Sequence, residues 1–341
     1  MSDGERITLG HGAGGRLTQR LIREIFLPAY GNPLLDELGD AALAPDPQGA
    51  LALTTDGFVV SPLFFPGGDI GSLAVNGTVN DLAVAGARPL WLTLAAIIEE
   101  GLPLEDLRRV AASVRRAAAG AGVAVVAGDT KVVERGKGDG LFLVSAGVGR
   151  RRPDHPRADR GTQPGDVILV SGPVGDHGAV ILSARRGIEL ESPLQSDCAP
   201  VTPLVDALFA AGVAPLFLRD PTRGGLGGVL CDLAGADLDM PRLGVLVDEE
   251  ALPIRPEVAA ICEITGVDPL LLACEGRVVA VVEVAQTETA LAAWRALPAG
   301  SGAARIGVLT SEGAGRVALR NGWGGRRVLL RPLADPLPRI C

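Results

Sequence analysis

Two kinds of apolar segment alternate along this chain, and their alternation limits the folds that it can adopt. Short runs that are almost wholly apolar, such as residues 90–98 and 141–148, are typical of buried strands. Residues 70–86 and 103–119 instead repeat apolar side chains at helical spacing. Both halves of the chain show this mixture in a similar order. We therefore predict an α/β protein with mixed sheets of the α+β kind.

A charged, proline-rich segment over residues 150–165 separates the two halves. It has neither the helical nor the strand period, so we interpret it as the linker or rim between two domains. The length of 341 residues also corresponds to about two domains of ordinary size. We expect an N-terminal domain over residues 1–152, a C-terminal domain over residues 153–331 and a tail over residues 332–341.

Composition argues against several classes of function. Apolar residues form 47% of the chain and aromatic residues 3%, so aliphatic side chains must fill the cores. A net charge of −8, without basic stretches that contain aromatic residues, argues against nucleic-acid binding. No apolar run is long enough for a membrane span or a secretory signal. We expect a cytoplasmic protein with no nucleic-acid or membrane partner.

Four aspartates stand at predicted strand ends or among small residues. They are Asp40, Asp56, Asp81 and Asp129. Asp56 ends a predicted strand that begins at residue 51, and Asp129 comes just after a predicted strand over residues 123–127. Ligands commonly bind beyond the ends of strands, and several carboxylates that converge there require a cation. Mg²⁺ takes carboxylate oxygens together with phosphate oxygens, so the four aspartates are candidate metal ligands. The alternative is that each one caps a helix or forms part of a turn.

Two glycine-rich loops are candidate phosphate-binding segments. The first includes Gly12, Gly14 and Gly15, and glycines allow several backbone N–H groups to approach a phosphate. The second covers residues 219–226 and leads into an apolar helix, whose N-terminus favours an anion. Neither loop matches a Rossmann or P-loop pattern, and a flexible surface loop or a tightly packed helix cap explains each equally well.

Lys131 and Glu275 are candidates for catalysis. Lys131 lies two residues after Asp129, where its charge would suit ATP phosphates, although a solvated lysine is the simpler interpretation. Glu275 interrupts an apolar run over residues 270–284, where an acid rarely lies without a partner. It is either a general base or the partner of Arg277 in an ion pair. The three histidines show no spacing of a catalytic triad or a metal site.

The chain has five cysteines, and their spacing predicts neither disulfides nor a zinc site. Four lie in or beside apolar segments, where a cysteine acts as a small buried hydrophobe. Cys341 differs because it ends a segment with three prolines, which cannot be helical and is expected to form an extended, mobile tail. Six extended residues reach about 20 Å, enough for Cys341 to enter a cleft of its own domain. It is either a carrier thiol or an incidental last residue.

The residues match a known family. Residues 54–101, AGDTKVVERG, RDPTRGGL and the final PRIC closely resemble the HypE family of hydrogenase maturation proteins, which are carbamoyl dehydratases. The superfamily also contains aminoimidazole ribonucleotide synthetase, selenophosphate synthetase and thiamine monophosphate kinase. The resemblance implies two aminoimidazole ribonucleotide synthetase-like domains, a homodimer built through strands of the N-terminal domain, and ATP with Mg²⁺ near the domain boundary.

The resemblance also implies a reaction. In this family the C-terminal cysteine receives a carbamoyl group from the carbamoyltransferase HypF, ATP activates the amide oxygen, and elimination leaves a thiocyanate. The cyano group then passes through the HypC–HypD complex to the iron of a nickel–iron hydrogenase. By the same resemblance Cys341 is the carrier, Lys131 contacts phosphate or substrate, and Glu275 is the acid–base group. The expected nucleotide and Mg²⁺ contacts are Asp56, Asp81 and Asp129, with Asn80 and Thr130 beside them.

Two alternatives remain open. The chain could be a small-molecule kinase or an ATP-dependent synthetase of the same superfamily, but such an enzyme needs no terminal cysteine. It could also be a non-catalytic scaffold that only carries the cyano group. Hydrolysis of ATP with and without Cys341 distinguishes the scaffold from the enzyme.

Overall fold

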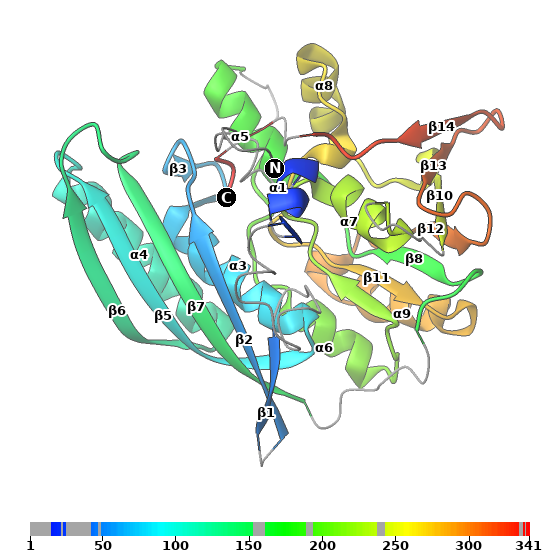
Figure 1. Cartoon of the computed structure of the whole chain (residues 1–341), viewed down its shortest axis with the longest axis horizontal. Coiled ribbons are helices and arrows are strands. Elements are labelled where there is room, and N and C mark those ends of the chain that lie inside the picture. Colours follow the sequence, from blue (N-terminus) through cyan, green and yellow to red (C-terminus); the bar gives the residue numbers. More distant parts are fainter. Residues whose placement is uncertain are drawn as a thin grey trace.

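The computed structural model describes residues 15–21, 23–24, 42–46, 49–152, 161–188, 194–236, 243–333, 337 and 339–341. Figure 1 shows two α/β halves side by side along the long axis, with the C-terminus where they meet. Of the predicted linker, residues 153–160 lie outside the described part. No helix in the described ranges has the length and hydropathy needed to cross a membrane.

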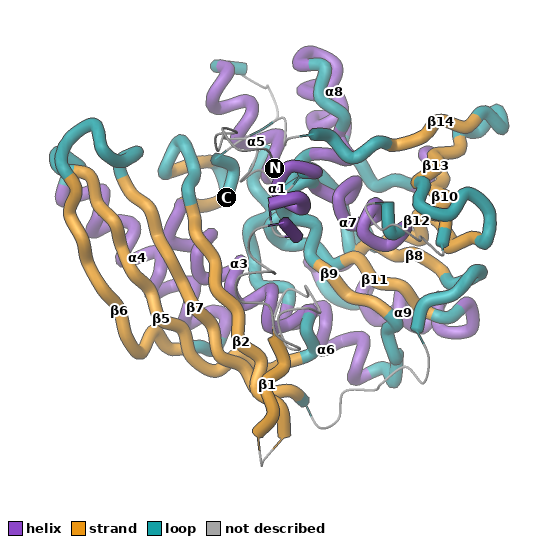
Figure 2. The backbone as a smooth tube through the Cα atoms, viewed as in Figure 1, coloured by secondary structure: helices purple, strands orange, loops and turns teal. Residues whose placement is uncertain are grey.

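The N-terminal half is a five-stranded sheet with two helices on one face (Figure 2). The strand order is β1-β2-β7-β5-β6, and all neighbours are antiparallel except β5 and β6. The strands are β1 (Ala42–Asp46), β2 (Gly49–Phe58), β5 (Ala87–Glu99), β6 (Ala124–Val133) and β7 (Leu141–Arg151). The helices are α3 (Ile70–Val84) and α4 (Leu104–Ala121). The parallel pair β5–β6 requires a crossover, and α4 provides it.

Helix α3 is buried almost all round because it lies between this sheet and the C-terminal half. Asp69 caps its N-terminus by accepting from the backbone of Gly71 and Ser72. The Ser72 hydroxyl in turn accepts from the Asp69 N–H at 3.0 Å, which completes a capping box. The hairpin β3 (Phe64–Phe65) and β4 (Gly68–Asp69) precedes it. Gly77 allows close approach to Phe58 of β2, since a Cβ there would lie 2.9 Å from the ring.

The C-terminal half is a seven-stranded sheet in the order β14-β13-β10-β12-β8-β11-β9. The strands are β8 (Val167–Val170), β9 (Phe217–Arg219), β10 (Gly244–Asp248), β11 (Val279–Val282), β12 (Ala304–Thr310), β13 (Val317–Arg320) and β14 (Arg326–Leu329). Around them are α5 (Asp176–Arg186), α6 (Thr202–Ala210), α7 (Gly225–Ala234), α8 (Pro256–Thr265) and α9 (Thr287–Arg295). Ile168 of β8 packs on the α7 side and Leu169 on the α6 and α9 side, so the strand is apolar throughout.

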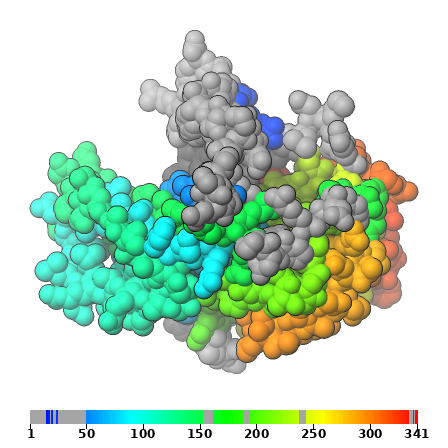
Figure 3. Space-filling view, turned by 90° about the horizontal axis from the view of Figure 1, so that it is seen from below, coloured from blue at the N-terminus to red at the C-terminus, as the bar shows by residue number. Residues whose placement is uncertain are grey.

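One hydrophobic core crosses the boundary between the halves. Ile70 and Leu73 of α3 share it with Ile181 of α5 and Ile261 of α8, and Ile340 of the tail belongs to it as well. The space-filling view also shows the cyan residues of the N-terminal half in contact with the green residues of the C-terminal half (Figure 3). The two halves are therefore packed on each other, which fixes the relative positions of residues at their junction.

Two strand ends predicted from the sequence are wrong. The strand expected to end at Asp56 continues to Phe58, and the strand expected over residues 123–127 continues to Val133. Backbone pairing with β7 and β5 extends both strands past their apolar runs, and this pairing does not depend on apolar side chains. Asp56 and Asp129 consequently lie within strands.

Candidate active site around Cys341

A small cavity of about 30 Å³ lies where the two halves meet, and the last residue of the chain lines it. The lining residues come from β2, α3, the loop before α7, the segment before β11 and the tail: Asp56, Gly57, Phe58, Gly77, Asp81, Asp220, Thr222, Arg223, Glu275 and Cys341. A space of this size holds one or two water molecules, so the polar groups around it are close to one another. The sequence predictions Asp56, Asp81, Glu275 and Cys341 thus meet at one place.

The end of the tail enters this junction in an extended form beside the segment that follows β2. The Val59 N–H donates to the Cys341 carbonyl at 3.3 Å, and the Ser61 N–H donates to the Arg339 carbonyl at 3.4 Å. Ile340 is buried in the shared core, and Leu337 is buried there too. These contacts place the Cys341 thiol at the cavity.

Glu275 is fully buried at the cavity wall. Burial, reinforced by the carboxylates of Asp220 and Asp197, raises the pKa of Glu275 well above its usual range. Among the described residues, no group lies within hydrogen-bonding distance of its Oε1. A buried carboxyl with a raised pKa and an available oxygen is suited to take up a proton, as a general base must.

Arg223 supplies positive charge to a cavity that is otherwise lined by acids. The neighbouring Cys341, together with Asp56 and Glu275, raises the pKa of Arg223. Arg223 is also exposed to solvent, so it can contact a molecule that approaches the cavity from outside. A guanidinium in this position suits recognition of a phosphate.

Asp56 and Asp81 fit the ligand preference of Mg²⁺. Burial raises the pKa of Asp56, against the lowering effects of Arg223 and of a hydrogen bond with Asp81. Asp81 also accepts from the Thr54 hydroxyl at 2.6 Å. No group of three or more His, Cys, Asp or Glu in the described ranges is arranged to hold a metal alone. Mg²⁺ commonly takes one or two protein carboxylates and completes its shell with water and phosphate, so this pair suffices.

The backbone of Glu275 is held by two buried polar side chains. Its N–H donates to Asp197 at 3.1 Å, and its carbonyl accepts from Asn80 of α3 at 3.2 Å. Arg277 pairs with Asp176 and Asp197, at 3.7 Å and 3.6 Å, so the proposed ion pair between Glu275 and Arg277 does not form. This leaves the Glu275 carboxyl directed to the cavity.

Comparisons with known proteins agree with this arrangement. Residues 38–151 match the family model of the AIR synthase related protein, N-terminal domain, and residues 163–320 match that of its C-terminal domain. The chain is 48% identical over 340 residues to the carbamoyl dehydratase HypE of Rhodobacter capsulatus, which covers 99% of this chain and 98% of that relative. This chain belongs to the HypE family.

Solved structures of the HypE family have the same fold. The HypE of a HypE–HypF complex is 43% identical with a TM-score of 0.83, covering 92% of this chain and 99% of that one. A HypE in complex with ATP is 44% identical with a TM-score of 0.79, covering 98% and 100%. The resemblance and the two-domain architecture predicted from the sequence are confirmed.

Three residues predicted to bind nucleotide lie away from the cavity of this HypE-family chain. Asp129 of β6 pairs with Ala95 of β5, and Ala95 pairs with Val144 of β7. Val144 in turn pairs with Gly57 of β2, the residue after Asp56. Three strand spacings separate Asp129 from β2, or about 14 Å at roughly 4.8 Å per strand. Lys131 pairs with Asp129 at 3.2 Å, and the Thr130 N–H donates to the same carboxylate.

Asp129 also faces the other side of the sheet. Side chains alternate between the two faces of a strand. Phe58 and Leu143 are buried on the face that the helices cover, whereas Val144 is exposed on the opposite face. Asp129 lies in the same row across the sheet as Val144, since both pair with Ala95, so it lies on that exposed face too. A single chain therefore does not bring Asp129 and Lys131 to Cys341.

The glycine loop and Asn80 have other positions. Gly12, Gly14 and Asp40 lie outside the described residues, so their predicted roles stay predictions. Gly15 packs against the base of the tail, where a Cβ would lie 2.8 Å from the Leu333 carbonyl. Asn80 is fully buried and uses its amide to tie α3 to residues 199–201 and to Glu275. Its observed contacts give it a structural role.

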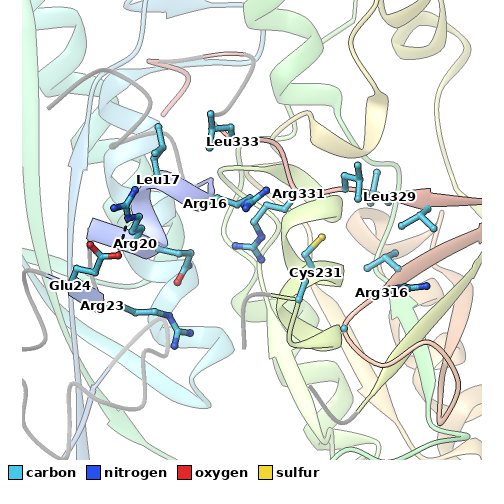
Figure 4. A pocket seen from close by; sticks show the side chains of 16 residues that line it. Arg16, Leu17, Arg20, Arg23, Glu24, Cys231, Arg316, Leu329, Arg331 and Leu333 are labelled. Carbon is cyan, nitrogen blue, oxygen red and sulfur yellow. Dashed lines mark hydrogen bonds and ion pairs between the residues drawn. The ribbon is translucent and has the colours of Figure 1, made fainter. Parts of the chain in front are cut away.

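A wider pocket of about 960 Å³ lies elsewhere, between α1 (Arg16–Leu21) and the strands β13 and β14 (Figure 4). Its lining combines apolar residues with five arginines, which are Arg16, Arg20, Arg23, Arg316 and Arg331. Glu24 is the acid in its lining, and it pairs with Arg20 at 2.8 Å. The pocket contains no residue predicted to do chemistry, so the cavity around Cys341 is the better candidate.

The sequence interpretation missed Asp220, Thr222, Arg223 and His177. The first three belong to the loop that was predicted to bind an anion, and the run of Asp, Thr and Arg before two glycines was the signal that singles out their side chains. His177 is buried against the tail, 163 residues before its partner Ile340. Nothing local in the sequence indicates that contact.

We predict that Gly276→Ala destabilises the fold by about 1–3 kcal/mol, the usual cost of overpacking. A Cβ at this position would lie 1.9 Å from the Asp197 carbonyl oxygen, and the Asp197 side chain also accepts from the Glu275 N–H. Urea unfolding measures the change. Gly120→Ala is the matched control because nothing lies near its Cβ in α4, and it should stabilise by about 0.4–1 kcal/mol. Equal stability of the Gly276 variant and the wild type would show that the loop adjusts freely.

Proposed function

We propose that this chain catalyses the ATP-dependent dehydration of a carbamoyl group on Cys341, which leaves a thiocyanate on that sulfur. The cyano group would serve as a ligand for the iron of a nickel–iron hydrogenase. The observation that carries the proposal is the position of the Cys341 thiol in one cavity with Glu275, Arg223 and two aspartates. The carbamoyl dehydratase activity named for its relatives supports it.

The chemistry needs both activation and removal of a proton. An amide oxygen is a poor leaving group, and transfer of the γ-phosphoryl group of ATP to that oxygen converts it into a good one. The nitrogen loses one proton as the phosphoryl group is transferred. It loses the second as the C–O bond breaks, so that phosphate leaves and a C≡N group remains on sulfur. Water would hydrolyse the phosphorylated intermediate, so a small cavity between packed halves is a suitable place for it.

The residues of the cavity divide this work. Glu275, with its raised pKa, would accept the proton from the carbamoyl nitrogen. Arg223 would neutralise charge on the phosphate as it leaves. Asp56 and Asp81 would hold Mg²⁺, which neutralises the phosphates of bound ATP. A HypE in complex with ATP is among the related structures and supports nucleotide binding at this fold.

We propose that a second copy of the chain supplies Asp129 and Lys131. Both lie on the outer face of the N-terminal sheet, where Leu53, Trp91 and Val144 are exposed. Exposed apolar side chains on an otherwise uncovered sheet face favour association. The homodimer implied by the family resemblance would cover this face and would bring new charged groups near the boundary of the halves.

The proposed partners follow from the chemistry of Cys341. HypF would donate the carbamoyl group, as the HypE–HypF complex of a relative suggests. The HypC–HypD complex would accept the cyano group. Both transfers require the thiol to leave the cavity, which holds too little space for a second protein.

The mass of the C-terminal peptide tests the proposed function. After HypF and its carbamoyl donor act on the protein, the peptide should gain one carbamoyl group on Cys341. Addition of ATP and Mg²⁺ should then remove the equivalent of one water molecule. A carbamoylated peptide whose mass stays constant with ATP would contradict the proposal and favour a carrier without catalysis.

Replacing Asp56, Asp81 or Asp129 with Asn should weaken Mg²⁺-dependent ATP binding by at least about 10–100-fold. Loss of a residue that only hydrogen-bonds to a metal ligand already has an effect of this size. Asn keeps the shape of each side chain but removes an anionic oxygen. Calorimetry with ATP and Mg²⁺ measures the affinity. The matched control is Asp106→Asn, a half-buried residue of α4 that pairs with Arg109 and lies outside the cavity. Unchanged affinity in all three variants would leave these aspartates with structural roles.

A further inference from the structure

Helix α5 holds the tail through backbone atoms of the tail. His177 lies at its start, with Nε2 2.7 Å from the Ile340 carbonyl oxygen. Arg185, two turns later, donates to the Arg339 carbonyl and, at 2.6 Å, to the Ser61 carbonyl. One helix of the C-terminal half thus contacts the last peptide groups of the chain and the segment beside them.

The contacts of His177 define its tautomer. A carbonyl oxygen only accepts hydrogen bonds, so Nε2 carries the proton. Nδ1 lies 2.8 Å from the Ser196 hydroxyl and accepts from it, and that same hydroxyl oxygen accepts from the Cys198 N–H at 3.1 Å. Burial lowers the pKa of His177 to about 4, so the ring is neutral at neutral pH. Both ring nitrogens therefore have a defined partner.

Packing fixes the orientation of the ring. His177 is fully buried, and its ring meets that of Phe65 edge to face, with centroids 5.2 Å apart and planes at 79°. The tail turns directly before its contact, since Arg339 has φ +59 in the left-handed region, and Arg339 pairs with Asp139. The Ile340 side chain is buried in the shared core. A buried ring that contacts Phe65 and makes two hydrogen bonds is a rigid donor.

The geometry of the peptide bond carries the effect of His177 to Cys341. The Ile340 carbonyl and the Cys341 nitrogen belong to one planar peptide group. A donor that fixes this carbonyl therefore also fixes the direction in which the Cys341 Cα and side chain leave the chain. The Val59 N–H holds the following carbonyl. The two bonds together orient the residue that bears the thiol.

We propose that His177 is a positioning residue for the dehydration step, which it serves by holding the 340–341 peptide so that the group on the Cys341 sulfur faces Glu275. The proposal rests on the proposed function. His177 contacts the backbone of Ile340, one residue before the thiol. It can therefore bind the tail in the same way whether the sulfur carries hydrogen, a carbamoyl group or a cyano group. The same contact must break each time the thiol leaves for a partner.

The first test measures docking of the tail without any chemistry. Alkylation of Cys341 by a maleimide is followed by mass spectrometry of the C-terminal peptide, in the absence of ATP and carbamoyl donor. His177→Ala should raise the alkylation rate about tenfold, as expected for loss of one buried hydrogen bond. His177→Gln keeps an N–H donor near the position of Nε2 and should bring the rate back towards that of the wild type.

Two further variants keep the test decisive if His177→Ala folds poorly. Ser196→Ala removes the group that holds Nδ1 and should raise the alkylation rate in the same direction. Arg186→Ala, an exposed residue at the end of α5, is the control and should leave the rate unchanged. Alkylation at the wild-type rate in folded His177→Ala and Ser196→Ala would overturn the proposal.

The catalytic readout separates positioning from general damage to the fold. In His177→Ala the rate of thiocyanate formation at saturating ATP should fall. The KM for ATP should stay close to that of the wild type, because His177 does not line the cavity with the aspartates and Arg223 that are proposed to bind ATP. A parallel loss of ATP affinity would contradict the positioning role. If the wild type forms no thiocyanate at all, the proposed function fails, whereas the alkylation result still decides whether His177 holds the tail.

Discussion

Replacing Cys341 with alanine should leave the fold intact and abolish formation of the thiocyanate. The backbone bond from the Val59 N–H to the Cys341 carbonyl does not depend on the side chain, so the substitution keeps this contact. The unfolding temperature should therefore match that of the wild type. The C-terminal peptide should show neither a carbamoyl nor a cyano group after incubation with HypF, its carbamoyl donor, ATP and Mg²⁺.

Cys198→Ala is the matched control for this experiment. Burial raises the pKa of the Cys198 thiol to about 12, so it is a poor nucleophile although it lies in the same core. Its loss should leave thiocyanate formation unchanged. A cyanylated peptide from the Cys341 variant would identify another cysteine as the carrier. Hydrolysis of ATP that continues unchanged without Cys341 would show that turnover is not tied to the tail.

The sequence predicts helices and strands well where an element is buried either on one face only or on both faces. The apolar run at β8 is continuous because helices cover both faces of its sheet, and the period of α4 is clear because one side of it faces solvent. Helix α6 and the strands β13 and β14 were not predicted. The segment of α6 begins with Thr202 and Pro203 and is short, and β14 is an exposed edge strand without an apolar run.

The candidate site was predictable in part, for a physical reason. Glu275 and Cys341 are conspicuous because an acid in an apolar run and a thiol at a chain end are both unusual, and the two meet at the cavity. Arg223 belongs to the loop that was predicted to bind an anion, but that loop does not indicate that Arg223 lies close to Cys341. No local pattern links His177 to Ile340. Asp129 was predicted from its position after an apolar run as well as from the family resemblance, and its place opposite the cavity would need a second copy to bring it into the site.

Replacing Glu275 with glutamine should slow dehydration by about 10²–10⁴-fold, the usual cost of losing a general base. Glutamine keeps the shape of the side chain but cannot accept the proton from the carbamoyl nitrogen. ATP binding should remain close to that of the wild type. Single-turnover assays that follow ADP and the cyanylated peptide together measure the effect, and Glu263→Gln, on an exposed residue of α8, is the control.

The pH dependence of the reaction gives a second signature of Glu275. A general base acts only when it is deprotonated, and burial raises the pKa of Glu275. The rate in the wild type should therefore fall as pH drops through this raised pKa, at a pH above the usual range of a glutamate. This acid limb should be absent from the profile of Glu275→Gln.

Glu275→Gln should also be at least as stable as the wild type at neutral pH. A carboxyl with a raised pKa binds its proton more tightly in the folded than in the unfolded state, so its contribution to stability is lost as pH rises through the folded pKa. Glutamine removes this loss, and urea unfolding at neutral pH measures it. A variant that is stable but slow would indicate that the acid is kept for catalysis at a cost to the fold. If instead the variant binds ATP poorly while its bound complex reacts at the normal rate, Glu275 belongs with the nucleotide and metal ligands, and another group takes the proton.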